Sequence, residues 1–245
     1  MKAHNFLFLS IIIIFVNYSA QKYLTLTTHK SNRFTSNNGA QDLIGKRVEC
    51  PNRGVLKNFV LKKQGKEYYY EYQCYSSNSN GIDEGEPITK GMSLNYVQYN
   101  KGSISKSLES FDGVNFQCFV DYGMNSFEIV KDTSNAFRSL GICKPLKTKS
   151  KQIGIKSKEK SGKETDLDNL VDITVGPTNT ETDSDIAFVL REFKYNVKTG
   201  WFNFITKKAT IYYTYSYSVV KNMKTVTNNY KTNFEKLRNG NNQKN

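Results

Sequence analysis

The residues whose types could do chemistry are few. Four cysteines lie beyond the N-terminal segment, at Cys50, Cys74, Cys118 and Cys143, together with a single histidine, His29. An even number of cysteines in an oxidising compartment is typical of disulfides, whereas a zinc site would need closer ligand spacing and more histidines. The sequence therefore predicts two disulfides, and neither a metal nor a cofactor.

Catalysis has little to work with in this chain. His29 lies in a stretch rich in Thr, Ser and Asn, and the cysteines are committed to bridges, so a Ser–His or Cys–His arrangement is implausible. Asp112 and Asp121 flank Cys118 and would suit a carboxylate pair, but solvated turn carboxylates are far commoner than catalytic ones. There is no phosphate-binding glycine loop and no EF-hand pattern. We expect a protein without enzymatic activity.

Lysine is the residue type that points to a partner. The formal net charge is +13, with lysine far more frequent than arginine, and removing residues 1–20, whose one charged residue is Lys2, leaves +12. A basic surface attracts polyanions. The candidate polyanion-binding residues gather between 144 and 163: Lys144, Lys147, Lys149, Lys151, Lys156, Lys158, Lys160 and Lys163. The alternative is a compositional bias, because the chain is also rich in Asn, Ile and Tyr.

Aromatic residues offer a second kind of contact. Tyrosines alternate in YYYEYQCY, residues 68–75, which is the period of a strand with two faces. Tyr69, Tyr75 and Tyr212 are candidates for an aromatic surface against which sugars could stack. The alternative is that the tyrosines form core and sheet cover. Trp201, beside Phe202, is expected to be buried.

These residues belong to a unit that the chain repeats. VECPNRGVLKNFVL, residues 48–61, aligns without a gap on FQCFVDYGMNSFEI, residues 116–129, when Cys50 is placed on Cys118. Counting alone allows three disulfide pairings. The matched spacing to Cys74 and Cys143 favours a bridge within each copy, Cys50–Cys74 and Cys118–Cys143.

A third, degenerate copy is predicted after residue 165. It places Val175 at the position of Cys50 and Tyr217 at the position of Cys74. Both cysteine positions are lost together, as a disulfide requires. The same alignment makes Phe59, Phe127 and Phe188 equivalent core residues.

The repeats predict a mostly antiparallel, all-β fold, because Tyr, Phe, Thr and Val dominate the periodic segments. Three hairpin-type repeats would form a pseudo-threefold prism or barrel, or a sandwich. The expected organisation is a signal peptide (1–20), an extended arm (21–42), repeat 1 (43–80), a connecting segment (81–110), repeat 2 (111–143), a flexible Lys-rich linker (144–165), repeat 3 (166–220) and a basic polar tail (221–245). The apolar run at 6–16 is too short to span a bilayer and is typical of a secretory signal.

The Cys…Gly…Phe-x-Leu…Tyr-x-Tyr-x-Cys unit resembles hairpin repeats of extracellular proteins of the dermatopontin or β-prism kind. The short signal and the Lys- and Asn-rich loops are similar to secreted surface or micronemal proteins of apicomplexan parasites. This resemblance implies a secreted protein, or one held in secretory organelles and then peripherally on the cell surface, in gamete contact or host-tissue invasion.

The expected function is adhesion, with a basic, tyrosine-rich β surface presented to an acidic glycan, an anionic membrane surface or a cell-surface receptor. Nucleic acid is not an expected partner. The alternative is a structural subunit of an extracellular coat or matrix, with contacts to itself or to another secreted protein.

Overall fold

The computed structural model describes residues 24–51, 54–77, 94–103, 105–131, 136–146, 151–178, 186–202 and 206–221. The expected signal peptide and nearly all of the predicted tail lie outside these residues, as do Lys147 and Lys149. In the described ranges the regular elements are strands and short 3-10 helices. The all-β prediction is therefore confirmed.

The described chain contains three units with the same order of elements: a first strand, a short 3-10 helix, a short strand and a long hairpin. The first unit comprises β1 (Leu24–Lys30), β2 (Phe34–Thr35), η1 (Gly39–Leu43), β3 (Val48–Glu49), β4 (Val55–Gln64) and β5 (Glu67–Ser77). The second comprises β6 (Leu94–Ser103), η2 (Leu108–Phe111), β7 (Asn115–Gln117), β8 (Tyr122–Lys131) and β9 (Ala136–Pro145). The third comprises β10 (Lys151–Lys156), β11 (Lys160–Lys163), η3 (Leu167–Asn169), β12 (Thr174–Val175), β13 (Ile186–Phe202) and β14 (Thr206–Lys221).

Each unit gives its first strand and its hairpin to one antiparallel sheet and its short strand to the sheet of another unit. The first sheet has the order β1-β5-β4-β12, the second β3-β8-β9-β6 and the third β10-β14-β13-β7. β2 and β11 continue the outer edges of the first and third sheets by pairing with β5 and β14. This cyclic exchange relates the units by a pseudo-threefold axis. The sheets stay open, so the three-sided arrangement applies and the closed barrel does not.

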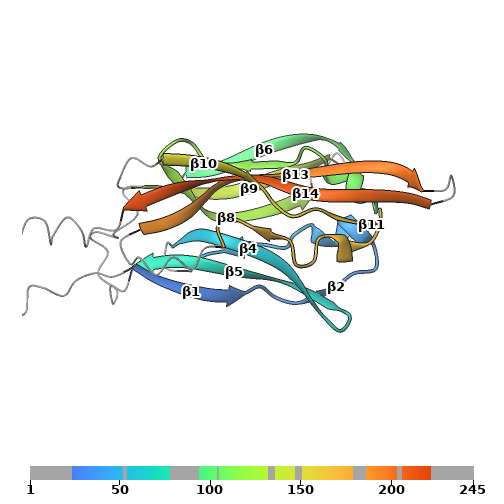
Figure 1. The fold of residues 1–245 in the computed structure, drawn as a ribbon, viewed down its shortest axis with the longest axis horizontal. Helices are drawn as coiled ribbons and strands as arrows, with labels where there is room; N and C mark the ends of the chain where they lie inside the picture. The colour runs from blue at the N-terminus through green and yellow to red at the C-terminus, as the bar shows by residue number, and fades with distance from the viewer. Residues whose placement is uncertain are drawn as a thin grey trace, which may run out of the picture.

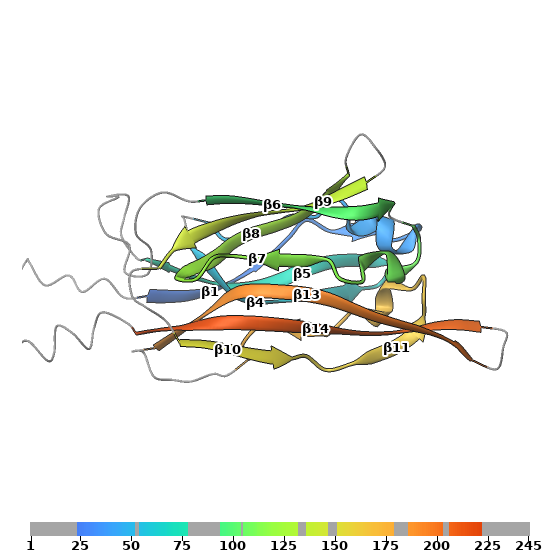
Figure 2. The same ribbon diagram turned by 90° about the horizontal axis from the view of Figure 1, so that it is seen from above.

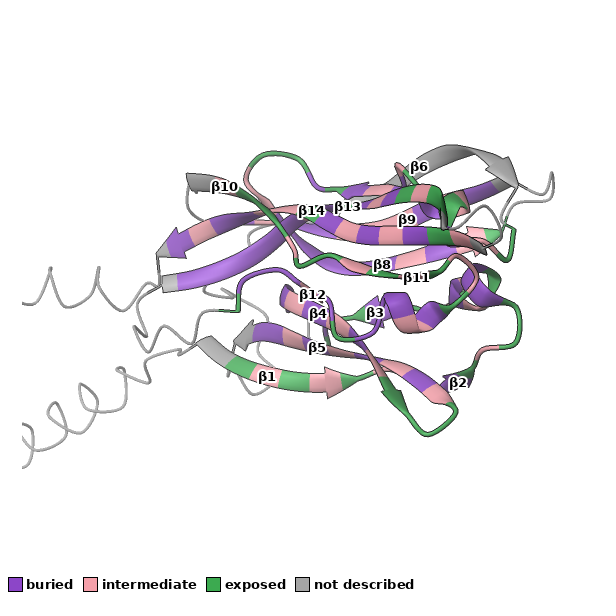
Figure 3. Ribbon diagram, turned by 45° about the vertical axis from the view of Figure 1, so that its right-hand side comes forward, coloured by how far each residue is buried: buried purple, intermediate pink, exposed green. Residues whose placement is uncertain are grey.

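The strands run along the long axis of the molecule, and the β13–β14 hairpin reaches past the other strands at one end (Figures 1 and 2). Buried residues alternate with exposed ones along β13 and β14, as expected for a sheet with one face on the core (Figure 3).

Three phenylalanines meet on the pseudo-threefold axis, one from each hairpin. The ring centroids of Phe59, Phe127 and Phe193 lie 4.5 Å (Phe59–Phe127), 4.8 Å (Phe59–Phe193) and 4.9 Å (Phe127–Phe193) apart. The prediction is therefore confirmed for Phe59 and Phe127 and wrong for Phe188, which packs instead against Tyr217 at 5.7 Å. β13 begins at Ile186, seven residues before Phe193, so the core phenylalanine of the third hairpin comes later in the chain than the sequence alignment placed it.

The same backbone contact closes each junction between units. A residue with positive φ donates its N–H to a carbonyl of another unit: Gly45 to Ile129 at 2.7 Å, Gly113 to Tyr195 at 3.0 Å and Asp172 to Leu61 at 2.9 Å. Asp172, at φ 62°, takes a conformation that favours glycine, so the third unit keeps the geometry although it has lost the glycine.

Both predicted disulfides are present, Cys50–Cys74 and Cys118–Cys143, each with a Cα–Cα distance of 5.7 Å. Each bridge joins a hairpin to the residue after a short strand, and that short strand belongs to a neighbouring sheet. The bridges therefore tie the first sheet to the second and the second to the third.

The junction between the third sheet and the first has no bridge. Val175 pairs with Phe59 as Val48 pairs with Phe127, so the cysteine position of the third unit is two residues later, at Pro177. The assignment of Val175 to that position was wrong. Tyr217 pairs with Leu190 as Cys74 pairs with Leu56, which agrees with its predicted equivalence to Cys74.

Each hairpin also carries a β-bulge at the same place, between Leu56 and Asn58, Met124 and Ser126, and Leu190 and Glu192. The residues at the bulges are Lys57, Asn125 and Arg191, and all three are buried. Asn125 Nδ2 donates to the carbonyl oxygens of Cys50 (3.1 Å) and Gly54 (2.6 Å). The bulge thus places a polar side chain where it satisfies backbone groups at a junction.

The segment from 144 to 165 differs from expectation. Its described residues form the end of β9, then β10 and β11, which pair with β14 along Lys151–Lys156 and Lys160–Lys163. The prediction of a flexible linker is wrong for these residues. The expected arm and connecting segment likewise supply β1 and β6, the first strands of their units.

Candidate functional site

The outward face of the third sheet concentrates lysines. Ala209 and Ile211 of β14 are buried, so the residues that alternate with them point outward. The outward rows across the sheet are Lys163, Lys208 and Gly200; Ser161, Thr210 and Lys198; Tyr212 and Asn196; and Lys156, Thr214 and Lys194. We call the exposed residues Lys156, Lys163, Lys194, Lys198 and Lys208 the basic face. From the row of Lys208 to the row of Thr214 it extends about 20 Å along the strands.

Tyr212 lies in the middle of the basic face. The Lys156 ammonium is 4.1 Å from the centroid of its ring, and the Lys198 ammonium is 5.6 Å away. Both are cation–π distances, and such contacts orient long lysine side chains that would otherwise be free to move. Tyr212 therefore holds two positive charges in place.

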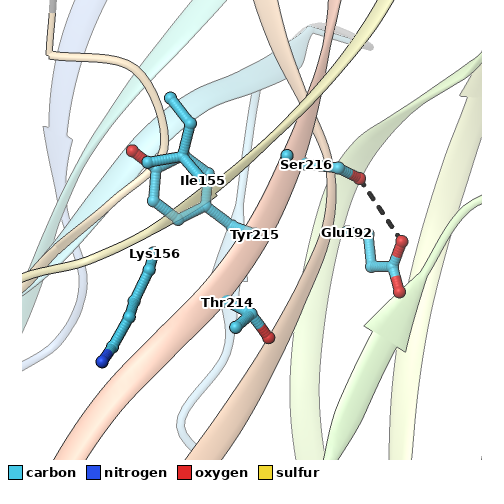
Figure 4. A pocket seen from close by; sticks show the side chains of 7 residues that line it. Ile155, Lys156, Glu192, Thr214, Tyr215 and Ser216 are labelled. Atoms are coloured by element: carbon cyan, nitrogen blue, oxygen red, sulfur yellow. Dashed lines mark hydrogen bonds between the residues drawn. The ribbon is translucent and has the colours of Figure 1, made fainter.

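A shallow, open pocket of 370 Å³ borders this face. Figure 4 shows the side chains that line it, with Lys156, Thr214 and Ser216 contributing polar groups. Ser216 Oγ also donates to Glu192 Oε2 at 3.3 Å. The pocket thus presents an ammonium group and hydroxyls together with the Glu192 carboxylate.

Two carboxylates lie near the basic face. Glu159 pairs with Lys156; this hydrogen bond lowers the pKa of the Glu159 carboxyl and raises the pKa of the Lys156 ammonium. Glu192 is paired with the guanidinium of Arg191, whose Nη2 is 2.9 Å from Glu192 Oε2. Within the described ranges, no ion pair joins a carboxylate to Lys163, Lys194 or Lys198, although the charge of Lys198 also helps to lower the pKa of the Glu159 carboxyl. The face keeps a net positive charge.

The first sheet offers an internal comparison. Tyr69 lies three residues before Tyr72, the partner of Phe59, just as Tyr212 lies three residues before Tyr215, the partner of Phe193. Lys30 and Arg33 stand 5.4 Å and 5.6 Å from the Tyr69 ring. Here the cations are neutralised, by pairs between Lys30 and Glu71 (3.8 Å), Arg33 and Glu67 (3.1 Å), and Lys62 and Asp172 (2.9 Å). Equivalent surfaces therefore differ in charge.

The lysines predicted between 144 and 163 have different surroundings. Lys156 and Lys163 belong to the basic face, and Lys158 is exposed between β10 and β11. Lys160 turns inward and donates to the carbonyl of Val171. Two lie elsewhere: Lys144 is buried at 8 % exposure, and Lys151 is in β10, where its side chain is not described. The expectation of a single stretch of exposed lysines is wrong at Lys144.

The sequence analysis missed Lys194, Lys198 and Lys208. Their signal was present in the alternation of buried Phe193, Tyr195 and Val197 with the residues between them. The third sheet carries lysines from both strands of its hairpin, β13 and β14, and from the Lys-rich segment. The pairing of β10, β11 and β13 with β14 brings these lysines onto one face.

Among the predicted aromatic surface residues, Tyr69 and Tyr212 are partly exposed. Tyr75 is buried, and its hydroxyl accepts from the backbone N–H of Phe188 at 3.4 Å, so its place in an aromatic surface was wrong. Trp201 was expected to be buried, but 68 % of it is exposed.

The residues weighed for catalysis make structural contacts. Asp112 Oδ1 accepts from the backbone N–H of Val197 at 2.8 Å. His29 Nε2 is 2.7 Å from Thr27 Oγ1, and its ring lies 5.6 Å from that of Tyr72. Across the described residues, no group of three or more His, Cys, Asp or Glu side chains is arranged to hold a metal ion.

In the described parts of the chain, no helix has the length and apolar character needed to cross a membrane. No protein-family model matches the chain, and no curated protein or solved structure is significantly similar to it.

Proposed function

We propose that this protein is a non-catalytic recognition protein whose basic face binds acidic glycans, such as sulfated or sialylated chains, at a cell surface or matrix. The observation that carries the proposal is the charge difference between equivalent sheets. The first sheet neutralises its outward cations with carboxylates at ion-pair distance, whereas among the described residues of the third sheet Lys163, Lys194 and Lys198 form no ion pair, and Lys198 feels Glu159 only at longer range.

The spacing of the lysines supports a linear ligand. Rows of outward residues repeat every two positions, about 7 Å apart along a strand. An acidic polysaccharide carries anionic groups at regular intervals, so a chain lying along β14 would meet ammonium groups on both of its sides. The ammonium groups of Lys156 and Lys198 lie over the Tyr212 ring. Tyr212 therefore contributes by positioning these two lysines, not by stacking on a sugar.

The compartment is consistent with this role. Two disulfides are compatible with an extracellular or secreted protein. The secretory signal predicted at residues 1–20 would deliver the chain to a place where acidic glycans are abundant. The resemblance to parasite surface proteins remains part of this proposal.

The test is salt elution from immobilised heparin with matched triple variants. Lys163→Gln, Lys194→Gln and Lys198→Gln remove three charges from the basic face. Lys30→Gln, Lys62→Gln and Lys63→Gln remove three from the first sheet, where each lysine is paired with a carboxylate: Lys30 with Glu71, Lys62 with Asp172 and Lys63 with Asp168.

We expect the basic-face variant to elute at clearly lower salt. Its affinity should also depend less on salt, because a variant with fewer lysines in contact with the glycan releases fewer counterions on binding. The first-sheet variant should elute close to wild type. Equal shifts in both variants would mean that net charge alone drives retention, and the assignment to the basic face would fail. Partially desulfated heparin should weaken binding of wild type in proportion to the charge removed.

One observation favours the structural alternative. β6 is an edge strand of ten residues with a single charged residue, Lys101, and in the described residues it pairs with β9 alone. An edge strand with so few charges is a template for pairing with another strand. If the protein is a coat subunit, sedimentation should show concentration-dependent assembly, and Tyr99→Lys on this edge should abolish it.

A further inference from the structure

A glycine in the interior of β10 has no structural reason to be there. Gly154 is the fourth of six residues in this strand, and the pairing of β10 with β14 runs without a bulge. Its φ lies outside the left-handed region, and no described atom apart from those of Gly154 and its chain neighbours lies within 4 Å of the position that a Cβ would take. Glycine weakens a strand and often marks a bulge or a close approach of another backbone or of a ligand. The first two do not apply to Gly154, which leaves a ligand.

The missing side chain leaves a hollow on the outward face of the third sheet. The hollow lies over two neighbouring rows across β10, β14 and β13: Gly154, Ser216 and Glu192 in one, and Lys156, Thr214 and Lys194 in the other. The pocket of 370 Å³ is lined by residues of both rows. Pockets that bind small ligands have volumes from about 300 Å³ upward. This one therefore has room for one small unit of a ligand.

Glu192 presents a hydrogen-bond acceptor to this pocket. Its Oε2 accepts from Arg191 Nη2 at 2.9 Å and from Ser216 Oγ at 3.3 Å, whereas its Oε1 has no partner in the described part of the chain. Arg191 is buried, and its Nη1 lies 3.4 Å from the carbonyl oxygen of Cys118. The buried guanidinium thus fixes the carboxylate and balances its charge, while one carboxylate oxygen stays available to a ligand.

Thr214 presents a donor close to this acceptor. Its Oγ1 accepts from Asn196 Nδ2 at 3.2 Å, and its own hydroxyl hydrogen has no acceptor among the described residues. Figure 4 shows Lys156 on one side of Thr214 and Glu192 on the other. A hydroxyl group can both donate and accept. Two neighbouring hydroxyls of a sugar can therefore bond to the pocket, one by donating to Glu192 and the other by accepting from Thr214.

The charges around the pocket disfavour an ionic group at this point. A sulfate or carboxylate of the ligand would face the Glu192 carboxylate, and like charges repel at close range. A cationic group would gain little, because Arg191 already balances Glu192 and Lys156 lies in the next row. An uncharged unit that carries hydroxyls meets both conditions.

We propose that this pocket binds one uncharged sugar unit of an acidic glycan, while the adjoining charged unit lies against Lys156 and Lys194. This inference rests on the proposed function and deepens it. The preferred glycan is one in which charged and uncharged units alternate, rather than one in which every unit is charged. Thr214 and Glu192 determine this specificity, whereas the lysines of the basic face attract any acidic chain.

The test compares two glycans with variants that change no charge. The probes are fluorescently labelled oligosaccharides of equal length from hyaluronan, which alternates a carboxylate-bearing sugar with an uncharged one, and from heparin, in which nearly every unit is charged. Gly154→Val fills the pocket. Gly200→Val is the matched control, because Gly200 is also exposed, has empty space at its Cβ position and lies in the row of Lys208. Valine favours strands, so both variants should melt no lower than wild type.

We expect Gly154→Val to lower the affinity for hyaluronan, measured by fluorescence anisotropy, about tenfold or more, because both hydrogen bonds are lost. Thr214→Val keeps the shape of the side chain without its hydroxyl and should lower this affinity about threefold. Gly200→Val should bind hyaluronan like wild type. Heparin affinity should stay close to that of wild type in all three variants, because the lysines are unchanged.

The outcomes separate this inference from the proposed function. Unchanged hyaluronan binding in Gly154→Val, or an equal loss in Gly200→Val or for heparin, would overturn the pocket and leave glycan binding by the basic face standing. A wild-type protein that binds heparin but not hyaluronan would do the same. Normal hyaluronan binding in Thr214→Val would contradict the part given to its hydroxyl. An unshifted heparin elution of the basic-face variant overturns the proposed function, and wild-type protein that binds neither glycan overturns both.

Discussion

Lys163 of β11 and Lys208 of β14 lie directly opposite each other in an antiparallel pair, both exposed on the same face of the third sheet. Like charges in directly opposed positions destabilise a sheet. The first sheet sets Lys30 opposite Glu71 in an ion pair, and the register that matches Tyr72 with Tyr215 makes Lys156 opposite Thr214 its counterpart. The third sheet thus has opposed lysines at one row and lacks, at another, the strand carboxylate that the first sheet carries.

Replacing Lys163 by Glu should therefore stabilise the protein while weakening its binding. An opposite charge facing Lys208 would turn repulsion into attraction, and for an exposed pair in a chain of this size we expect a rise in melting temperature of about 1–2 °C at low salt. Thermal unfolding at low and high salt measures the effect, which screening should remove. Lys163→Gln is the matched control, with a smaller rise. A fall in melting temperature for both variants would show that Lys163 makes a favourable contact.

Phe193 should be essential to the core where Phe188 is not. Phe193 is fully buried and completes the triangle with Phe59 and Phe127, so Phe193→Ala should lower the free energy of unfolding by about 3–5 kcal/mol. Phe188 packs outside that cluster, and Phe188→Ala should cost clearly less. Chemical denaturation of the two variants gives the comparison. A larger loss for Phe188→Ala would restore the alignment expected from sequence.

The junction without a bridge should accept one at the position that the sheet register defines. Pro177 and Tyr217 occupy the places of the paired cysteines in the other units. Pro177→Cys combined with Tyr217→Cys should form a third disulfide, seen as a linked peptide by non-reducing mass spectrometry. Val175→Cys combined with Tyr217→Cys follows the sequence alignment, and it should leave free thiols because Val175 faces Phe59. Linkage in the second variant alone would place the cysteine position at Val175.

The sequence was most informative where one unit could be compared with another. The cysteine spacing and the Phe-x-aliphatic element predicted both disulfides and two of the three core phenylalanines. The third unit failed at Phe193, because the chain between Val175 and its core phenylalanine is longer than the few extra residues that the alignment allowed, and Phe188 comes first in that stretch. The pairing of β13 with β7, which is distant in sequence, determines which phenylalanine of β13 enters the core.

The strands β10 and β11 of the third unit were not predicted, for a different reason. β10 and β11 are rich in lysine, and a segment of that composition cannot bury enough apolar surface to order itself. In the fold it needs only the free edge of β14, which supplies its backbone hydrogen bonds and lets the lysines face solvent. The basic face depends on this edge pairing, so part of it was predictable as lysine-rich but not as a surface shared with Lys194 and Lys198.

The contact at the base of the projecting hairpin should respond to pH in one direction. The hydrogen bond from Lys207, and then that from Thr199, holds the pKa of the Glu109 carboxyl below its usual value of 4.5. A carboxyl with a lowered pKa in the folded state contributes stability that is fully present above its unfolded pKa and is lost as pH falls through its folded pKa. Hydrogen bonds from Lys207 to Glu109 and Glu164 raise the pKa of its ammonium, so its own contribution persists up to alkaline pH.

Glu109→Gln should therefore be less stable than wild type between about pH 5 and pH 9, and the difference should shrink toward zero below about pH 4. The pair is exposed, so the difference will be small, and it is measured best as paired urea unfolding curves at each pH. Thr199→Val removes the hydrogen bond from the uncharged donor and keeps the ion pair with Lys207, so it should show a smaller loss over the same pH range, because this bond also lowers the pKa of Glu109. A Glu109→Gln difference that stays constant from pH 3 to pH 7 would mean that the carboxylate charge does not hold the hairpin.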